Sequence, residues 1–113
     1  MIICPASMNT VAAISAGLGG NLIDRCAHVH LKERRPLVIV PRETPLTQID
    51  LANLLRLSQA GAIIAPACPG FYLHPQSVDD LVAFVAGRVL DLVGIPHTLP
   101  VRYRARPEGS GCC

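Results

Sequence analysis

Polar and ionisable side chains follow the prolines that end three short apolar runs of this chain. Ser7 and Asn9 follow the first proline, Arg42 and Glu43 follow the second, and Tyr72 lies in the segment after the third. Hydroxyl, amide, phenol and guanidinium groups are suited to binding a phosphate, a carboxylate or a carbonyl oxygen. These residue types therefore predict a site for an anionic or carbonyl-bearing ligand.

The residues after the first proline also permit a purely structural interpretation. Ser7, Asn9 and Thr10 are all residue types that cap helix N-termini, where their side chains bond the first backbone amides. The same helix N-terminus nevertheless offers N–H groups and a positive dipole end to a ligand. Both roles are open from the residues alone.

Basic side chains are spaced for binding on two predicted helices. Arg25, His28 and Lys32 fall on one helical face, which is either a solvated basic stripe or a binding surface. Arg88 interrupts an apolar helical stripe, where an unpaired charge is costly. We therefore expect its long stem to reach water or its guanidinium to meet an anion.

The elements that must position these groups are strands alternating with helices. Apolar runs at 2–4, 37–40 and 62–65 predict strands, and the segments between them have helical character. The predicted helices are 7–20, 21–33 and 48–60, and a final helix begins with a capping box at 77–80. This alternation predicts a parallel α/β sheet, whose ligands bind outside the carboxyl ends of the strands.

The composition argues for one small folded domain without nucleic-acid binding. The 113 residues are half hydrophobic, and the formal net charge is only +2, with two Tyr and two Phe available to stack on bases. Nine of the ten basic residues are Arg, which suits phosphate or carboxylate binding through a planar fork of donors.

The cysteines do not predict a metal or redox site. No pair of the five has a CxxC spacing, and we expect Cys4, Cys26 and Cys68 to be small buried apolar residues. No signal peptide or membrane span is evident, so we predict a reduced cytoplasmic protein. Residues 105–113 are expected to form a flexible tail.

The chain begins directly on an apolar run that reads as a strand. Three strands leave two unpaired edges, whereas doubly wound domains usually have five or six strands. We therefore expect residues 1–104 to be the C-terminal part of a larger domain whose N-terminal strands are missing from this chain.

Several sequence blocks resemble a known family. Residues 5–10, Pro-Ala-Ser-Met-Asn-Thr, are similar to a signature of the flavin-containing cysteine decarboxylases. Residues 31–46, Leu-Lys-Glu-Arg-Arg-Pro-Leu-Val-Ile-Val-Pro-Arg-Glu-Thr-Pro-Leu, resemble the UbiX-type flavin prenyltransferases, as do 69–72, Pro-Gly-Phe-Tyr, and 75–81, Pro-Gln-Ser-Val-Asp-Asp-Leu. The blocks agree in order and spacing over about residues 1 to 104.

The resemblance implies a Rossmann-like or flavodoxin-like three-layer flavoprotein. Its implied activity is transfer of a dimethylallyl group from dimethylallyl phosphate to reduced FMN, at N5 and C6, without a metal. The implied product is prenylated FMN, the cofactor of UbiD-type decarboxylases in pathways such as ubiquinone biosynthesis. The family forms homo-oligomers, typically dodecamers, whose sites are shared between subunits.

The resemblance also implies roles for individual residues. The implied cofactor-binding residues are Ser7, Met8, Asn9, Thr10 and Arg42. The implied prenyl-phosphate ligands are Arg25, Lys32, Tyr72 and Arg88. The implied catalytic residues are Glu43, which would give a proton to the phosphate, together with Lys32, Arg25 and Tyr72.

Two departures from the family leave other functions open. The family's N-terminal half, with its Gly-Ala-Ser-Gly turn, has no counterpart here, and Tyr103 stands where the family often has tryptophan. One alternative is a flavin-dependent decarboxylase of the cysteine type, against which the block from Lys32 to Glu43 argues. The other is a truncated, non-catalytic flavin-binding or assembly subunit.

Overall fold

The computed structural model contains a parallel sheet of three strands, as predicted. The strands, in sheet order, are β1 (Ile2–Ala6), β2 (Val38–Pro41) and β3 (Ile63–Ile64). The structure describes residues 1–99, so Tyr103 and the predicted tail at 105–113 lie outside the described residues. Because β2 is central and pairs with both neighbours, both of its faces must be covered by other elements.

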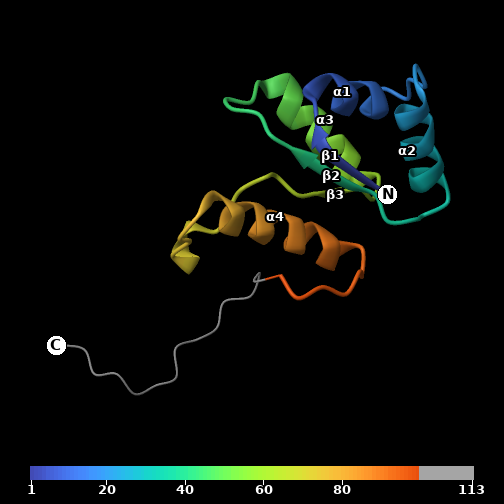
Figure 1. Ribbon diagram of the computed structural model, residues 1–113. Helices are drawn as coiled ribbons and strands as arrows, with labels where there is room; N and C mark the ends of the chain where they lie inside the picture. Colours follow the sequence, from blue (N-terminus) through green and yellow to red (C-terminus); the bar gives the residue numbers. More distant parts are fainter. Residues whose placement is uncertain (100–113) are drawn as a thin grey trace.

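Helices cover the two faces of the sheet unequally. On one side lie three helices: α1 (Met8–Ser15), α2 (Leu22–Lys32) and α3 (Gln48–Gln59). On the other side lies α4 (Val78–Leu92), preceded by a short 3-10 turn, η1 (Phe71–Leu73). Figure 1 shows α1 and α3 above the sheet and α4 below it. The predicted three-layer α/β architecture is confirmed.

The side chains of the central strand alternate between two cores. Leu37 and Ile39 pack with residues of α1 and α3, whereas Val38 and Val40 pack toward Val89 of α4. The four consecutive side chains from Leu37 to Val40 are completely buried. Full burial of each such side chain contributes about 1.5 to 3 kcal/mol relative to exposure, so this strand anchors both layers.

Each α-helix begins at a side chain that accepts the amide of the third helical residue. The pairs are Ser7 with Thr10, Asn21 with Asp24, Thr47 with Asp50, and Ser77 with Asp80. The last two pairs are full capping boxes, because the aspartate also accepts the cap amide. The capping box predicted at 77–80 is therefore confirmed.

The first helix ends earlier than the glycine pattern suggested. The first helix was expected to reach residues 19–20, but it ends at Ser15, where Gly17 adopts a φ of +76° and the Leu18 amide donates to the Ala13 carbonyl at 2.9 Å. This is a Schellman motif, in which a left-handed residue reverses the chain. Leu18 consequently lies outside the helix and is 59% exposed.

The end of α2 has the same backbone geometry without a glycine. Arg34 has a φ of +57°, and the Arg35 amide donates to the His30 carbonyl at 2.9 Å. A left-handed conformation strains any residue that has a Cβ atom. The charged segment after α2 is thus held in a locally unfavourable turn.

The expectation that the three cysteines are buried was wrong. Cys4 and Cys68 are exposed and Cys26 is only partly buried: Cys4 lies in the edge strand β1, and Cys68 lies in the segment after β3. In α3 only Leu54 and Leu57 are buried, whereas Ile49, Leu51 and Leu55 are each more than half exposed. No helix among residues 1–99 is long and apolar enough to cross a membrane.

Candidate functional site

The register of the sheet brings two of the predicted polar segments together. Ala6 of β1 is paired with Pro41 of β2, after an irregularity in β1 between Ile3 and Ala6. The next residues are Ser7 and Arg42, and neighbouring strands lie about 4.8 Å apart. The turn at Ser7 and the segment that begins at Arg42 therefore leave the same edge of the sheet side by side.

The segment after β3 reaches this edge as well. The Ala67 amide donates to the Pro41 carbonyl at 3.0 Å, and the Ala65 amide donates to the Ile39 carbonyl at 2.8 Å. The chain thus continues strand-like hydrogen bonding beyond Ile64. Residues from all three strand ends meet at the carboxyl edge, where open α/β sheets bind their ligands.

The N-terminus of α1 opens at this edge without an acidic residue. Asp24, Asp50 and Asp80 lie in the first turns of the other three α-helices, whereas the first turn of α1 contains none. Ser7 caps α1 through the Thr10 amide at 3.1 Å. Since a helix leaves its first N–H groups without helical acceptors, the positive end of α1 is available to an anion or a carbonyl oxygen.

The predicted site residues at this edge differ in exposure. Ser7, Asn9, Arg42 and Glu43 are exposed, so their polar groups are accessible from solvent. Met8 is partly buried and packs against the core, which fixes the turn between β1 and α1. The structure thus brings the predicted cofactor-binding residues and Glu43 to one edge.

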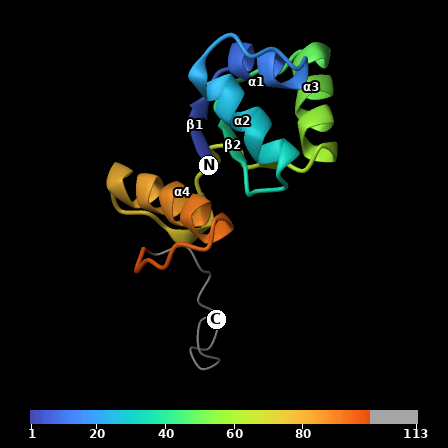
Figure 2. The same ribbon diagram turned by 90° about the vertical axis from the view of Figure 1, so that its right-hand side faces the viewer.

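The basic residues of α2 lie at the opposite edge of the sheet. Pro36, just before β2, accepts hydrogen bonds from the Met1 amino group and from His30 of α2, both at 2.9 Å. The end of α2 is therefore beside the strand starts. Figure 1 shows α2 on the side of the sheet where β1 begins, and Figure 2, which looks from that side, shows α2 in front of β2. Lys32 is exposed there, and Arg25 Nε donates to the Gly19 carbonyl at 3.2 Å.

The predicted basic stripe of α2 is only partly solvated. Arg25 and Lys32 are exposed, but His28 is partly buried. Its Nε2 atom and the Oδ1 atom of Asp24, one helical turn away, are buried without a hydrogen-bond partner among the described residues. His28 therefore turns toward the protein interior rather than extending the stripe.

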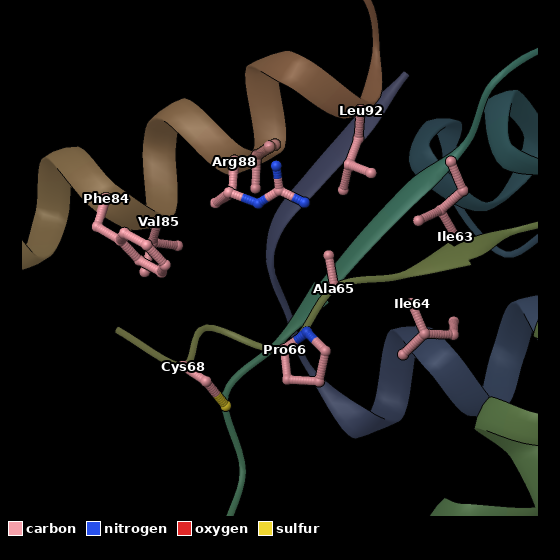
Figure 3. Close-up of a pocket in the computed structure, with 10 residues that line it drawn as sticks. Ile63, Ile64, Ala65, Pro66, Cys68, Phe84, Val85, Arg88 and Leu92 are labelled. Atoms are coloured by element: carbon pink, nitrogen blue, oxygen red, sulfur yellow. The ribbon is translucent and has the colours of Figure 1, made fainter. Parts of the chain in front are cut away.

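Tyr72 and Arg88 occupy a third location, on the α4 side of the sheet. Tyr72 lies in η1 and packs edge-to-face on Phe84 of α4, with ring centroids 6.3 Å apart. Arg88 lines a cavity of about 310 Å³ between α4 and the segment that includes β3. Figure 3 shows the Arg88 guanidinium on the side of α4 that faces Ala65 and Pro66.

The wall of this cavity is almost entirely apolar. Its other lining residues are Ile63, Ile64, Ala65, Pro66, Cys68, Phe84, Val85, Val89 and Leu92. Arg88 is the one ionisable side chain apart from the Cys68 thiol among the lining residues, and it is 52% exposed. An apolar hollow with a cation at its rim is suited to an amphiphilic anion.

Arg88 also meets an acidic partner that the sequence analysis missed. Its Nη1 atom lies 3.4 Å from Oδ2 of Asp91, whose Oδ1 atom lies 2.8 Å from Nε2 of His97. The spacing of three residues between Arg88 and Asp91 on a predicted helix was the available signal. The charge in the apolar stripe is therefore both solvated and paired.

One chain thus presents the predicted site residues in three separate places. Ser7, Asn9, Arg42 and Glu43 lie at the carboxyl edge, Arg25 and Lys32 on α2 at the opposite edge, and Tyr72 and Arg88 on the α4 side. Among residues 1–99, no three His, Cys, Asp or Glu side chains are grouped to hold a metal ion.

Residues 1–90 match the model of the family described as Flavoprotein. The chain belongs to the flavoprotein family. In this flavoprotein the polar segments gather at the carboxyl edge of the parallel sheet, where open α/β sheets bind their ligands.

This flavoprotein is similar to proteins named as flavin prenyltransferases. It is 55% identical over 103 residues to the flavin prenyltransferase UbiX of Pseudomonas aeruginosa, covering 91% of this chain and 49% of that protein. The chain spans about half the length of the curated relatives it matches.

Solved structures agree with this similarity. The dodecameric FMN-dependent UbiX-like decarboxylase from Escherichia coli O157:H7 superposes with a TM-score of 0.89 at 48% identity, covering 93% of this chain and 57% of that one. AnUbiX (PadA1), solved in complex with FMN and dimethylallyl pyrophosphate, has a TM-score of 0.82 at 50% identity, covering 84% and 50%.

Proposed function

We propose that this flavoprotein acts as a flavin prenyltransferase, transferring a dimethylallyl group from dimethylallyl phosphate to reduced FMN. The observation that carries the proposal is the pairing of Ala6 with Pro41, which sets the open N-terminus of α1 beside Arg42 and Glu43. Relatives with 55% to 56% sequence identity to this chain are named flavin prenyltransferases, which supports the same activity.

The residues at the carboxyl edge fit a flavin. The first turn of α1 lacks an acid, and the exposed side chains of Ser7 and Asn9 can bond carbonyl or phosphate oxygens. We infer that residues 7–10 and Arg42 hold FMN. Reduced FMN, when bound, is the acceptor of the prenyl group at N5 and C6.

The basic residues and Tyr72 are proposed to hold the phosphate of the prenyl donor. Breakage of the carbon–oxygen bond leaves the bonding electron pair on the departing phosphate, so charge builds there in the transition state. The proposed ligands of this phosphate are the cations Arg25, Lys32 and Arg88 and the phenol of Tyr72. They would stabilise the transition state more strongly than the ground state, because the phosphate carries more charge in the transition state. Glu43 would give a proton to a phosphate oxygen and so improve the leaving group.

A complete site requires more than one copy of the chain under this proposal. Arg25 and Lys32 lie at the opposite edge of the sheet from Glu43, and Tyr72 and Arg88 lie on a different face. This separation supports a homo-oligomer, since a neighbouring copy can supply the missing cations. A dodecamer like the E. coli structure is the form we propose.

The proposed product, prenylated FMN, would then serve a UbiD-type decarboxylase, and we propose a cytoplasmic location for this step.

Anaerobic incubation of the purified chain with reduced FMN and dimethylallyl phosphate, followed by mass spectrometry of the extracted flavin, tests the activity. A flavin heavier by one C5 unit is the expected result. Unmodified flavin, beside an active P. aeruginosa UbiX control, would instead favour a flavin-binding subunit or a decarboxylase.

A further inference from the structure

Three side chains form a continuous hydrogen-bonded series at the end of α4. Arg88 Nη1 contacts Asp91 Oδ2 at 3.4 Å, and Asp91 Oδ1 contacts His97 Nε2 at 2.8 Å. The series continues to the backbone, because the Leu99 amide donates to His97 Nδ1 at 3.0 Å. An exposed arginine is thereby connected to an imidazole whose side chain is only 10% exposed.

The backbone contact determines which nitrogen of His97 carries the proton. Since Nδ1 accepts the Leu99 N–H, it has no proton of its own, and Nε2 carries the hydrogen that points to Asp91. The imidazole therefore donates from Nε2 to the carboxylate of Asp91. Asp91 in turn has one oxygen for His97 and the other for Arg88.

This arrangement orients Arg88 and leaves most of its hydrogen-bond donors available to a ligand. A guanidinium has five N–H donors, and the contact with Asp91 uses one of them. Arg88 lines the cavity between α4 and β3, with a half-exposed side chain. A long side chain that is fixed at one donor loses less conformational entropy when the others bind an anion.

We propose that Asp91 and His97 are positioning residues that hold the Arg88 guanidinium at the rim of this cavity for an organic phosphate. The proposal rests on the proposed role of Arg88 in binding the prenyl phosphate. His97 orients Asp91, and Asp91 orients Arg88. Neither Asp91 nor His97 needs to touch the ligand.

A purely structural role for the pair makes different predictions. In that role the Asp91–His97 bond would only fasten residues 95–99 to the end of α4, and its loss would lower stability without acting through Arg88. A positioning role requires that the effect disappear when Arg88 is absent. A double-mutant cycle with Arg88→Met separates the two roles.

The first measurement follows the Arg88 side chain directly, with no flavin or donor present. The ¹⁵N order parameter of its Nε–H group reports picosecond-to-nanosecond motion, and its signal is assigned from Arg88→Lys. We expect Asp91→Asn and His97→Phe to lower this order parameter. His97→Gln, which keeps a donor that can reach Asp91, should preserve most of it.

The matched control is Asp79→Asn, which makes the same chemical change on the same helix. Asp79 lies in the first turn of α4 and is not the capping-box acid, which is Asp80. It should leave the Arg88 signal unchanged. Thermal unfolding by circular dichroism identifies any variant that fails to fold. If His97→Phe does not fold, the result for Asp91→Asn alone tests the proposal.

The second measurement is the affinity for dimethylallyl phosphate by calorimetry. Asp91→Asn and His97→Phe should each weaken binding about three- to tenfold, and neither should weaken it further in the Arg88→Met background. An unchanged Arg88 order parameter in both variants, or an equal loss of affinity with and without Arg88, would overturn the proposal. Absence of prenyl transfer would count only against the proposed function, because the Arg88 measurement requires no reaction.

Discussion

Gly70 lies directly against the ring of Phe84, so that a Cβ atom on Gly70 would fall 2.9 Å from two ring carbons and 3.1 Å from the Tyr72 ring. The contact holds the loop after β3 onto α4. It also determines where Tyr72 lies relative to Arg88 on the same side of the sheet. The proposed phosphate ligands of this side therefore depend on a glycine that binds nothing itself.

Substitution of Gly70 by Ala should displace η1 from α4. A contact of 2.9 Å cannot be kept, and inserting a methyl group into a packed contact typically costs about 1 to 3 kcal/mol. We expect a weaker nuclear Overhauser effect between the Tyr72 and Phe84 rings and a higher KM for dimethylallyl phosphate. Phe84→Leu should partly rescue Gly70→Ala by making room, and an unchanged ring contact in Gly70→Ala would contradict the prediction.

Substitution of two capping serines distinguishes an effect on helix stability from an effect on flavin binding. Ser7→Ala and Ser77→Ala each remove one cap bond, to the amides of Thr10 and Asp80, and should each cost about 1 kcal/mol of unfolding free energy. Only Ser7→Ala should also weaken FMN binding, because only Ser7 lies at the carboxyl edge beside Arg42. Denaturant unfolding and flavin fluorescence titration measure the two effects. Equal FMN affinity in both variants would remove Ser7 from the cofactor site.

Glu43→Gln tests the proposed proton donor. The amide keeps the size of the side chain but cannot give up a proton, so turnover should fall by about a hundredfold or more while FMN remains bound. Single-turnover prenylation followed by mass spectrometry gives the rate. Glu33→Gln, at the exposed C-terminal cap of α2, is the matched control and should leave the rate unchanged. A normal rate in Glu43→Gln would exclude proton transfer from Glu43.

Mixed oligomers test whether sites are shared between copies. Lys32→Ala and Glu43→Gln should each be inactive alone, because each removes a group of the proposed site. If one site takes Lys32 and Glu43 from different copies, a refolded equimolar mixture should recover activity in about a quarter of its sites. Recovery is measured as prenylated FMN formed per chain. A mixture as inactive as its components would indicate that both residues come from one copy.

Substitution of Arg34 by glycine should increase the stability of the protein. Its φ of +57° is strained for a residue with a side chain, and relief of that strain should raise the unfolding free energy by up to about 1 kcal/mol. Arg35→Gly is the matched control, because Arg35 is not among the described residues with positive φ, and it should lower stability. Thermal unfolding of the two variants at one salt concentration compares them. A lower melting temperature for Arg34→Gly would mean that its side chain makes a compensating contribution.

The sequence predicted the local elements well because their signals are local. Apolar runs and N-cap residues placed the three strands and four helix starts within a few residues, and the capping box at 77–80 was correct. The end of the first helix and the burial of Cys4 and Cys68 were wrong. Burial depends on what packs above each residue, and apolar neighbours in the sequence do not determine that.

The sequence by itself predicted which residues carry the chemistry, and its motifs indicated the family to which the chain belongs. Only the tertiary structure decided which of those residues meet. Ser7 and Arg42, 35 positions apart, become neighbours because parallel strands pair in a register that joins Ala6 to Pro41. Lys32 and Glu43 are closer in sequence, yet they lie at opposite edges because β2 runs between them, and a strand separates its two ends by its own length.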